Sequence, residues 1–314
     1  MLPSLLVAAL LAADEPAFEK KTHVFKSVGE VKIEADVYRH ADQKARPVLV
    51  WIHGGALIMG SRNSVPKDLL DLARTEGCCL VSLDYRLAPE VKLPAIIDDL
   101  KDAFRWIREQ GPRLFHADPK RIVVAGGSAG GYLTMMTGVC VEPRPTALVA
   151  YWGYGDVDGD WYTQPSAHYR KTVPLIAKEE AQKGVGGPVL SGVATKEQGQ
   201  GRSRYYLYLR QNGLWTKEVT GFDPATDKAK LDPYCPVRNL SAQYLPILML
   251  HGTADTDVPH ELSANMAKEL MRLKLPHEFI SVPGGNHGLS NADDPKQIIE
   301  ARTRALAFIR KHLQ

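Results

Sequence analysis

The strongest candidate for catalysis is a serine in the glycine-rich segment Gly126-Gly-Ser128-Ala-Gly130. The apolar run before it predicts a strand, and the residues after it predict a helix. On a sharp strand-to-helix turn a serine hydroxyl projects beyond the sheet edge, and flanking glycines allow the neighbouring chain to approach closely. A glycine-rich turn without chemistry is the alternative for the motif alone. Its strand–turn–helix context favours Ser128 as a nucleophile.

A serine hydroxyl needs a base, and the base needs an orienting carboxylate. His287 lies in the small-residue loop Pro283-Gly-Gly-Asn-His287 after an expected strand, from which an imidazole can reach Ser128. Another expected strand is followed by Asp255 and Asp257. We assign Asp255 as the orienting carboxylate. Asp257 precedes an expected helix start and suits a turn or a charge at the helix N-terminus.

Stabilisation of an oxyanion requires backbone N–H groups from a second loop. The segment His53-Gly54-Gly55-Ala56 follows an apolar strand, and its lack of bulky side chains allows N–H groups to face a substrate carbonyl. Ala129, directly after the nucleophile, supplies a further N–H. His53 is expected to support this loop by side-chain hydrogen bonding rather than to act as a second base.

Strand-like and helix-like segments alternate along the chain. This alternation, with apolar strands, predicts an α/β fold in which helices cover both faces of a mostly parallel sheet. The first two strands are expected to form an antiparallel hairpin. The expected strands are residues 23–27, 31–38, 47–52, 79–83, 121–125, 147–152, 246–251 and 277–282, and the expected helices are 67–76, 95–110, the stretch after Ser128, 260–273 and 296–312.

Residues 153–244 lack this regularity and predict a lid-like insertion after the strand at 147–152, within a single domain of residues 14–314. The insertion is rich in aromatic side chains, which either line a substrate pocket or pack its own small core. At least half are expected to pack, including those of a short helix around Tyr205 and Tyr206. The aromatic residues are Tyr154, Trp161, Tyr162, Tyr169, Tyr205, Tyr206, Tyr208, Trp215 and Phe222.

The composition excludes several classes of function. The 314 residues include 39 basic and 36 acidic side chains, a net charge of +3, and no dense basic patch, so no nucleic-acid partner is expected. The four cysteines have no metal-ligand spacing, so no metal site is expected, and one disulfide stays open.

The first 13 residues form an apolar run that ends in small side chains. We expect a signal peptide at residues 1–13, and hence a secreted or periplasmic protein, although no basic residue precedes the run. The alternative is a hydrophobic N-terminal helix of a cytoplasmic protein. The run is too short to span a bilayer, and no other stretch resembles a membrane span.

These motifs together resemble the α/β-hydrolase superfamily, specifically the hormone-sensitive-lipase-like and BD-FAE-like esterases. The order serine, aspartate, histidine is the order of that superfamily. The resemblance implies the α/β-hydrolase fold, no cofactor, and Gly55 and Ala56 as oxyanion N–H donors beside the supporting residue Gly54. It rests on His53-Gly-Gly, Asp84-Tyr-Arg-Leu-Ala-Pro-Glu90, the nucleophile segment 118–131, the segment 252–259 and His287-Gly.

Three departures favour the BD-FAE-like branch, whose members act as acetyl, feruloyl or other small-acyl esterases. Ala56 replaces a glycine, Gly127 replaces an acidic residue, and Tyr132 replaces a common asparagine. The resemblance thus implies a serine esterase that cleaves small-molecule esters with small acyl or aromatic groups, including carbohydrate acetyl or feruloyl esters.

Two other functions stay open. An amide hydrolase, formamidase-like or peptidase-like, would use the same triad. A non-catalytic relative that binds a small ligand would be expected to lose a triad residue or the oxyanion glycines, and none is lost here. The sequence predicts no oligomeric state.

Overall fold

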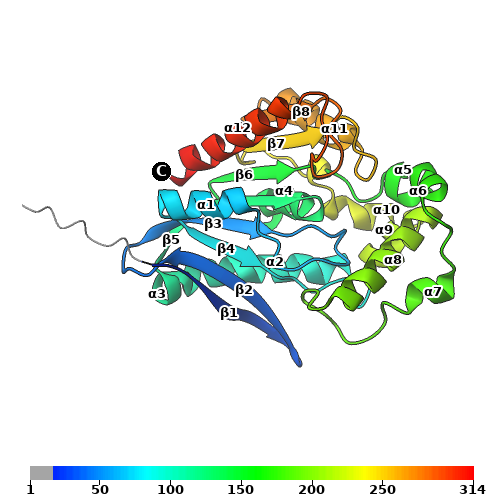
Figure 1. The fold of residues 1–314 in the computed structure, drawn as a ribbon, viewed down its shortest axis with the longest axis horizontal. Coiled ribbons are helices and arrows are strands. Elements are labelled where there is room, and N and C mark those ends of the chain that lie inside the picture. Colours follow the sequence, from blue (N-terminus) through cyan, green and yellow to red (C-terminus); the bar gives the residue numbers. More distant parts are fainter. Residues whose placement is uncertain (1–16) are drawn as a thin grey trace, which may run out of the picture.

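The computed structural model describes residues 17–314, so the expected signal peptide at residues 1–13 lies outside the described residues and stays a prediction. The described chain contains an eight-stranded sheet in the order β1-β2-β4-β3-β5-β6-β7-β8 (Figure 1). The strands are β1 (Phe18–Val28), β2 (Val31–His40), β3 (Arg46–Ile52), β4 (Cys79–Leu83), β5 (Ala117–Gly127), β6 (Ala147–Tyr151), β7 (Ile247–Gly252) and β8 (His277–Val282).

The sheet is mostly parallel, as predicted. The hairpin β1–β2 is antiparallel, and β2 pairs antiparallel with β4. The neighbours in the rest of the sheet, β4-β3-β5-β6-β7-β8, all pair in parallel. Parallel neighbours end at the same edge of a sheet. The loops after β3, β5, β7 and β8, which carry the predicted site residues, therefore leave the sheet at one edge.

Helices cover both faces of the sheet, because successive side chains of a strand point to opposite faces. In β3, Val48, Val50 and Ile52 pack against one helical layer, and Leu49 and Trp51 pack against the other. One layer contains α1 (Lys67–Glu76) and α12 (Pro295–Leu313), and the other contains α2 (Leu93–Glu109), α3 (Gly111–Phe115), α4 (Ala129–Cys140) and α11 (His260–Arg272).

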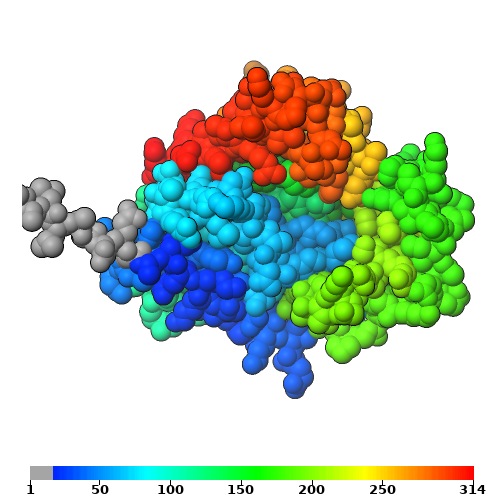
Figure 2. Space-filling model, viewed as in Figure 1, coloured from blue at the N-terminus to red at the C-terminus, as the bar shows by residue number. Residues whose placement is uncertain are grey.

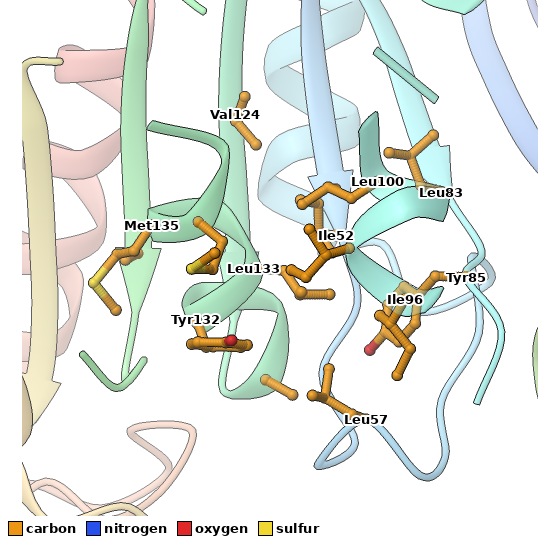
Figure 3. Close-up of a cluster of buried hydrophobic side chains, with 14 of the residues drawn as sticks. Ile52, Leu57, Leu83, Tyr85, Ile96, Leu100, Val124, Tyr132, Leu133 and Met135 are labelled. Atoms are coloured by element: carbon orange, nitrogen blue, oxygen red, sulfur yellow. The ribbon is translucent and has the colours of Figure 1, made fainter. Parts of the chain in front are cut away.

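Each face of the sheet carries a cluster of buried hydrophobic side chains, and the larger cluster packs against the loop after β3 at the carboxyl edge of the sheet. Figure 3 shows part of it, with Ile52 of β3, Leu100 of α2 and Leu133 of α4 together with Leu57 of the loop after β3. All of these side chains are at most 2% exposed. The observed layers and sheet confirm the predicted α/β-hydrolase fold class.

The segment after β6 folds into helices, most of them short, at the carboxyl end of the sheet (Figure 1, green to yellow-green). The prediction of weak regularity was wrong for residues 195–204, which begin the 17-residue helix α8 with a capping box between Thr195 and Gln198. The helices are α5 (Asp160–Thr163), α6 (Ala167–Thr172), α7 (Lys178–Gln182), α8 (Lys196–Asn212), α9 (Trp215–Thr220) and α10 (Lys228–Leu231), followed by 3-10 turns η1 (Asp232–Tyr234) and η2 (Pro236–Arg238).

The four cysteine side chains are free thiols. From residue 17 onward, no helix is long and apolar enough to cross a bilayer.

Candidate active site

Ser128 occupies the turn between β5 and α4 with φ 57° and ψ −122°, a conformation that is costly for a residue with a side chain. The turn is held by a hydrogen bond from the Ser128 N–H to the Tyr151 carbonyl, 2.9 Å. The flanking glycines are required by space. A Cβ at Gly126 would lie 2.3 Å from the Gly130 carbonyl oxygen, and one at Gly130 would lie 2.0 Å from the Ile52 carbonyl oxygen.

Asp255 and His287 form a hydrogen-bonded pair at the same edge of the sheet. His287 Nδ1 lies 2.7 Å from Asp255 Oδ2. The other carboxylate oxygen, Oδ1, accepts the backbone N–H groups of Asp257 and Val258, each at 2.9 Å. Two main-chain donors thus fix the rotation of the carboxylate and direct Oδ2 to the imidazole.

A second histidine, which the sequence analysis missed, also contacts this carboxylate. His251, the penultimate residue of β7, is fully buried, and its Nε2 lies 3.2 Å from Asp255 Oδ2. Its Nδ1 lies 2.8 Å from the hydroxyl of Ser263 in α11. A fully apolar strand that ends in a buried histidine was the available sequence signal.

The pKa values of the pair shift in opposite directions. Burial by itself raises the pKa of Asp255, but hydrogen bonds from His251 and His287 outweigh it and hold that pKa far below its usual range. Burial by itself lowers the pKa of His287, but the hydrogen bond to Asp255 and the charges of Asp257 and Asp255 raise it above 6.5 overall. The carboxylate therefore stays ionised, and the imidazole is a stronger base than a free histidine.

Among the described residues, the Ser128 hydroxyl makes no hydrogen bond, and His287 Nε2 faces the second carboxylate instead. Asp257 Oδ2 lies 3.6 Å from that nitrogen. Ser128 and Gly288 nevertheless line the same cavity, so the nucleophile and the histidine loop adjoin. Catalytic hydrogen bonds are often long in ligand-free sites and shorten when substrate binds.

The loop after β3 presents unpaired N–H groups. A peptide carbonyl and the N–H of the same peptide point in opposite directions, so fixing one fixes the other. The carbonyl of Gly54 is contacted by His53 Nδ1 at 2.7 Å, and the carbonyl of Gly55 accepts the N–H groups of Ile58 and Met59, each at 2.9 Å. The N–H groups of Gly55 and Ala56 find no acceptor within residues 17–314.

His53 lies in the loop-supporting position predicted for it. Its ring is fully buried and stacks on Tyr85 with centroids 4.3 Å apart. Burial lowers the pKa of His53 to about 4, so the ring is neutral near pH 7 and donates through Nδ1 to Gly54. The imidazole therefore supports the loop.

The loop has three successive residues with positive φ: Gly55 at 107°, Ala56 at 55° and Leu57 at 63°. Successive N–H groups in such conformations form a concavity that binds anions. The insertion helps to hold it, because the fully buried Trp215 of α9 donates its indole N–H to the Ala56 carbonyl at 3.1 Å. Arg202 of α8 donates to the Ile58 carbonyl at 2.9 Å.

A cavity of about 300 Å³ opens beside Ser128. It lies where the surface in Figure 2 is hollowed between the cyan segment that contains α1 and the orange-red C-terminal segment. The aromatic side chains that line it come from β3, from β6 and from the residue directly after β6, not from the insertion. The lining residues are Trp51, Gly54, Ser64, Pro66, Asp68, Leu69, Gly127, Ser128, Tyr151, Trp152, Gly288 and Arg302.

The aromatic residues of the insertion mainly pack together and around one cation. Tyr162 stacks between Trp161 and Trp215, with ring centroids 3.4 and 3.7 Å apart. The guanidinium of Arg210, on α8, lies 5.1 Å from the ring centre of Tyr162 and 5.2 Å from that of Tyr169. These contacts fit the expectation that at least half of the aromatic residues pack rather than line the pocket.

Asp257 lies just before the start of a helix, as predicted, but its side chain also has partners that this position does not explain. Helix α11 begins at His260, and the Asp257 side chain points to the insertion, where Tyr169, Tyr206 and Arg210 donate to its Oδ1. No local pattern indicates these contacts, because the donors lie 47 to 88 residues away in the chain. Within residues 17–314, no group of three or more His, Cys, Asp or Glu side chains is arranged to hold a metal ion.

Comparison with known proteins agrees with this geometry. A family model described as alpha/beta hydrolase fold matches residues 49–291. The chain belongs to this family. The matched segment contains the three candidate triad residues and both loops that present N–H groups, and the family resemblance predicted from the motifs is confirmed.

Three similar proteins illustrate the range of relatives. The non-reducing polyketide synthase Preu6 of Preussia isomera is 26% identical over 314 residues, which cover 91% of this chain but 14% of the synthase. The chain therefore spans about one seventh of that relative's length.

Two solved structures show the same fold over nearly the whole chain. A protein of unknown function from Staphylococcus aureus subsp. aureus Mu50 has a TM-score of 0.74 at 21% identity, covering 94% of this chain and 100% of that one. An acetyl ester-xyloside bifunctional hydrolase from Caldicellulosiruptor lactoaceticus has a TM-score of 0.65 at 20% identity, covering 93% and 96%.

Proposed function

We propose that the protein is a serine carboxylic-ester hydrolase with Ser128 as nucleophile, His287 as base and Asp255 as orienting carboxylate. The observation that carries the proposal is the 2.7 Å His287–Asp255 hydrogen bond at the sheet edge where Ser128 occupies its strained turn. Membership of the α/β-hydrolase family, and the activity named for the similar Caldicellulosiruptor structure, support it.

Acylation begins when a bound ester brings His287 Nε2 within reach of the Ser128 hydroxyl. The oxygen of Ser128 attacks the ester carbonyl while Nε2 takes its proton. Asp255 holds the imidazole with Nδ1–H directed toward itself and stabilises the imidazolium. The N–H groups of Gly55, Ala56 and Ala129 donate to the tetrahedral oxyanion, because the loop after β3 leaves its own two unpaired.

Collapse of the tetrahedral intermediate breaks the ester C–O bond. His287 Nε2 returns its proton to the leaving alcohol, and the acyl group stays on Ser128. Water then attacks the acyl-enzyme with the same histidine as base, which releases the carboxylic acid and restores the serine. In both steps where His287 acts as base, the neutral imidazole is in the tautomer that Asp255 fixes, and in the steps between them Asp255 stabilises the imidazolium.

The cavity favours small acyl or aromatic acyl groups. Its volume of about 300 Å³ lies at the lower end of the range of small-molecule sites. Its walls include the rings of Trp51, Tyr151 and Trp152, against which a planar group can stack. The similar acetyl ester-xyloside hydrolase supports acetyl esters, including those of carbohydrates, as the first candidates.

The experiment compares wild type with Ser128→Ala on p-nitrophenyl esters of increasing chain length, a sugar acetate, a feruloyl ester and an anilide. We expect Ser128-dependent turnover of the shorter or aromatic esters and little turnover of the anilide. Turnover of the anilide alone would replace the proposal with an amide hydrolase. No Ser128-dependent turnover of any substrate would refute hydrolysis by this site.

A further inference from the structure

The two carboxylate oxygens of Asp257 have different surroundings. Its Oδ1 accepts hydrogen bonds from the Tyr169 hydroxyl at 2.9 Å, the Arg210 guanidinium at 2.8 Å and the Tyr206 hydroxyl. Its Oδ2 makes no hydrogen bond with any residue from 17 to 314 and is not a buried atom, and the side chain as a whole is 19% exposed. One oxygen is thus an anchor, and the other is an open acceptor.

The open oxygen lies beside the atom that must protonate the leaving group. Asp257 Oδ2 is 3.6 Å from His287 Nε2, just beyond hydrogen-bond length. A leaving alcohol oxygen must come within hydrogen-bond reach of Nε2 to receive its proton. A hydroxyl on the next carbon of that alcohol would then be able to reach Asp257 Oδ2.

The charge around Asp257 favours a neutral donor over a cation. Arg210 is 3% exposed in its side chain, pairs with Asp257 at 2.8 Å, and also donates to the Asp257 backbone carbonyl at 3.0 Å. Burial raises the pKa of the Tyr169 and Tyr206 phenols, so both remain protonated donors to the same carboxylate. Because Arg210 already pairs with this carboxylate, an added cation gains less there than at an unpaired carboxylate, while Oδ2 can still accept a hydrogen bond.

We propose that Asp257 determines specificity for the alcohol part of the ester, its Oδ2 accepting a hydrogen bond from a hydroxyl adjacent to the ester oxygen. The preferred substrates are then esters of vicinal diols and other polyhydroxylated alcohols. This inference rests on the proposed ester hydrolysis and deepens it, because it assigns a residue to the leaving-group side of the site.

The test uses 2-hydroxyethyl acetate and n-propyl acetate, which are similar in size and differ by a hydroxyl in place of a methyl. Each kcat/KM is divided by the rate of alkaline hydrolysis of the same ester, which removes the intrinsic difference in reactivity. We expect wild type to prefer the hydroxyethyl ester about tenfold, the effect of one hydrogen bond to a charged group. We expect Asp257→Asn to reduce the preference to below about threefold, since a neutral amide oxygen is a weaker acceptor.

The control is Tyr169→Phe, which removes a donor to Oδ1 and leaves Oδ2 in place. We expect this variant to keep the preference of wild type for the hydroxyethyl ester, whatever its effect on absolute rates. Equal loss of the preference in Tyr169→Phe and Asp257→Asn would show that only the packing of the insertion matters, and would overturn the assignment. Acetylcholine, a cationic ester, tests whether Asp257 Oδ2 receives a hydroxyl or a cation. A preference of wild type for acetylcholine over both neutral esters would show that the site binds cations and would overturn the proposal.

The wild-type comparison needs no variant and stands even if Asp257→Asn does not fold. Ser128-dependent hydrolysis of p-nitrophenyl acetate without a preference for the hydroxyethyl ester would refute the role of Asp257 and leave the proposed function intact. Failure of wild type on p-nitrophenyl acetate would instead remove the proposed function itself.

Discussion

Replacement of Asp255 by asparagine should impair the enzyme through the tautomer of His287. Asp255 Oδ1 accepts two backbone N–H groups at 2.9 Å, so an asparagine must place its carbonyl oxygen there. Its NH₂ group then occupies the position of Oδ2, 2.7 Å from His287 Nδ1. A donor at that position makes Nδ1 the acceptor and puts the ring proton on Nε2. The protonated Nε2 cannot accept the proton of Ser128.

The magnitude follows from this forced orientation. The equivalent substitution in a serine protease preserves the geometry and lowers kcat about 10⁴-fold. A loss of that size corresponds to about 5.4 kcal/mol of transition-state stabilisation. Because the main-chain donors prevent the amide from flipping, we expect a loss of about 10³- to 10⁴-fold in kcat for Asp255→Asn.

The assay is hydrolysis of p-nitrophenyl acetate at several pH values, with thermal unfolding measured in parallel. The matched control is Asp257→Asn, which makes the same chemical change two residues away. The fold-loss in kcat for this control should be at least a hundred times smaller than the fold-loss for Asp255→Asn. A kcat for Asp255→Asn within tenfold of wild type, in folded protein, would refute the tautomer argument. A larger loss in the control would identify Asp257 as the orienting carboxylate.

Three further predictions concern other parts of the site. Trp215→Phe removes the indole donor to the oxyanion loop and should lower kcat on p-nitrophenyl acetate about five- to tenfold with a smaller change in KM, the effect of about 1 kcal/mol. The acid limb of kcat/KM should lie at higher pH than the titration of an unperturbed histidine, because His287 accepts a proton only when neutral and its pKa is raised. Asp257→Asn removes one raising charge and should move that limb to lower pH. Gly126→Ala places a Cβ 2.3 Å from a carbonyl oxygen and should lower the unfolding free energy by about 1–3 kcal/mol in urea titration, whereas Gly187→Ala, with open space around it, should change it little.

The sheet and the positions of the loops that carry Ser128, Asp255 and His287 were predictable because their signals are local. Apolar runs such as Val48–Ile52 specify buried strands, and glycine-rich segments directly after them specify loops at one edge of a parallel sheet. The predicted segments 67–76, 79–83 and 277–282 coincide with α1, β4 and β8. The support of the loop after β3 by His53 was predictable for the same reason, since the partner of His53 is the next residue in the chain.

The insertion was harder, because its regularity depends on contacts rather than on periodicity. Gly199 and Gly201 weaken the helix propensity of residues 196–204, yet the capping box at Thr195 and packing against α7 and α9 stabilise α8 there. The capping box was the signal that an analysis of composition overlooks. The site residues that come from the insertion, Trp215 and Arg210, therefore had no predictable place.

Long-range juxtaposition explains the remaining differences. Trp51 and Tyr151 belong to apolar strands and look like ordinary core residues in sequence, but they line the cavity beside Ser128 because they lie next to the open edge of the sheet. The partners of Asp257 are likewise set by tertiary structure. A sequence pattern identifies a carboxylate after a strand, but only the packed insertion shows what it faces.

The most direct test of the central claim is to find which residue becomes covalently modified. Wild type, and Ser128→Ala as a control, are treated with a fluorophosphonate and digested, and the modified peptide is identified by mass spectrometry. We expect one modification, on Ser128, with loss of ester hydrolysis in proportion to labelling, and no labelling or hydrolysis in Ser128→Ala. Labelling of another residue, or hydrolysis that persists in folded Ser128→Ala, would contradict it.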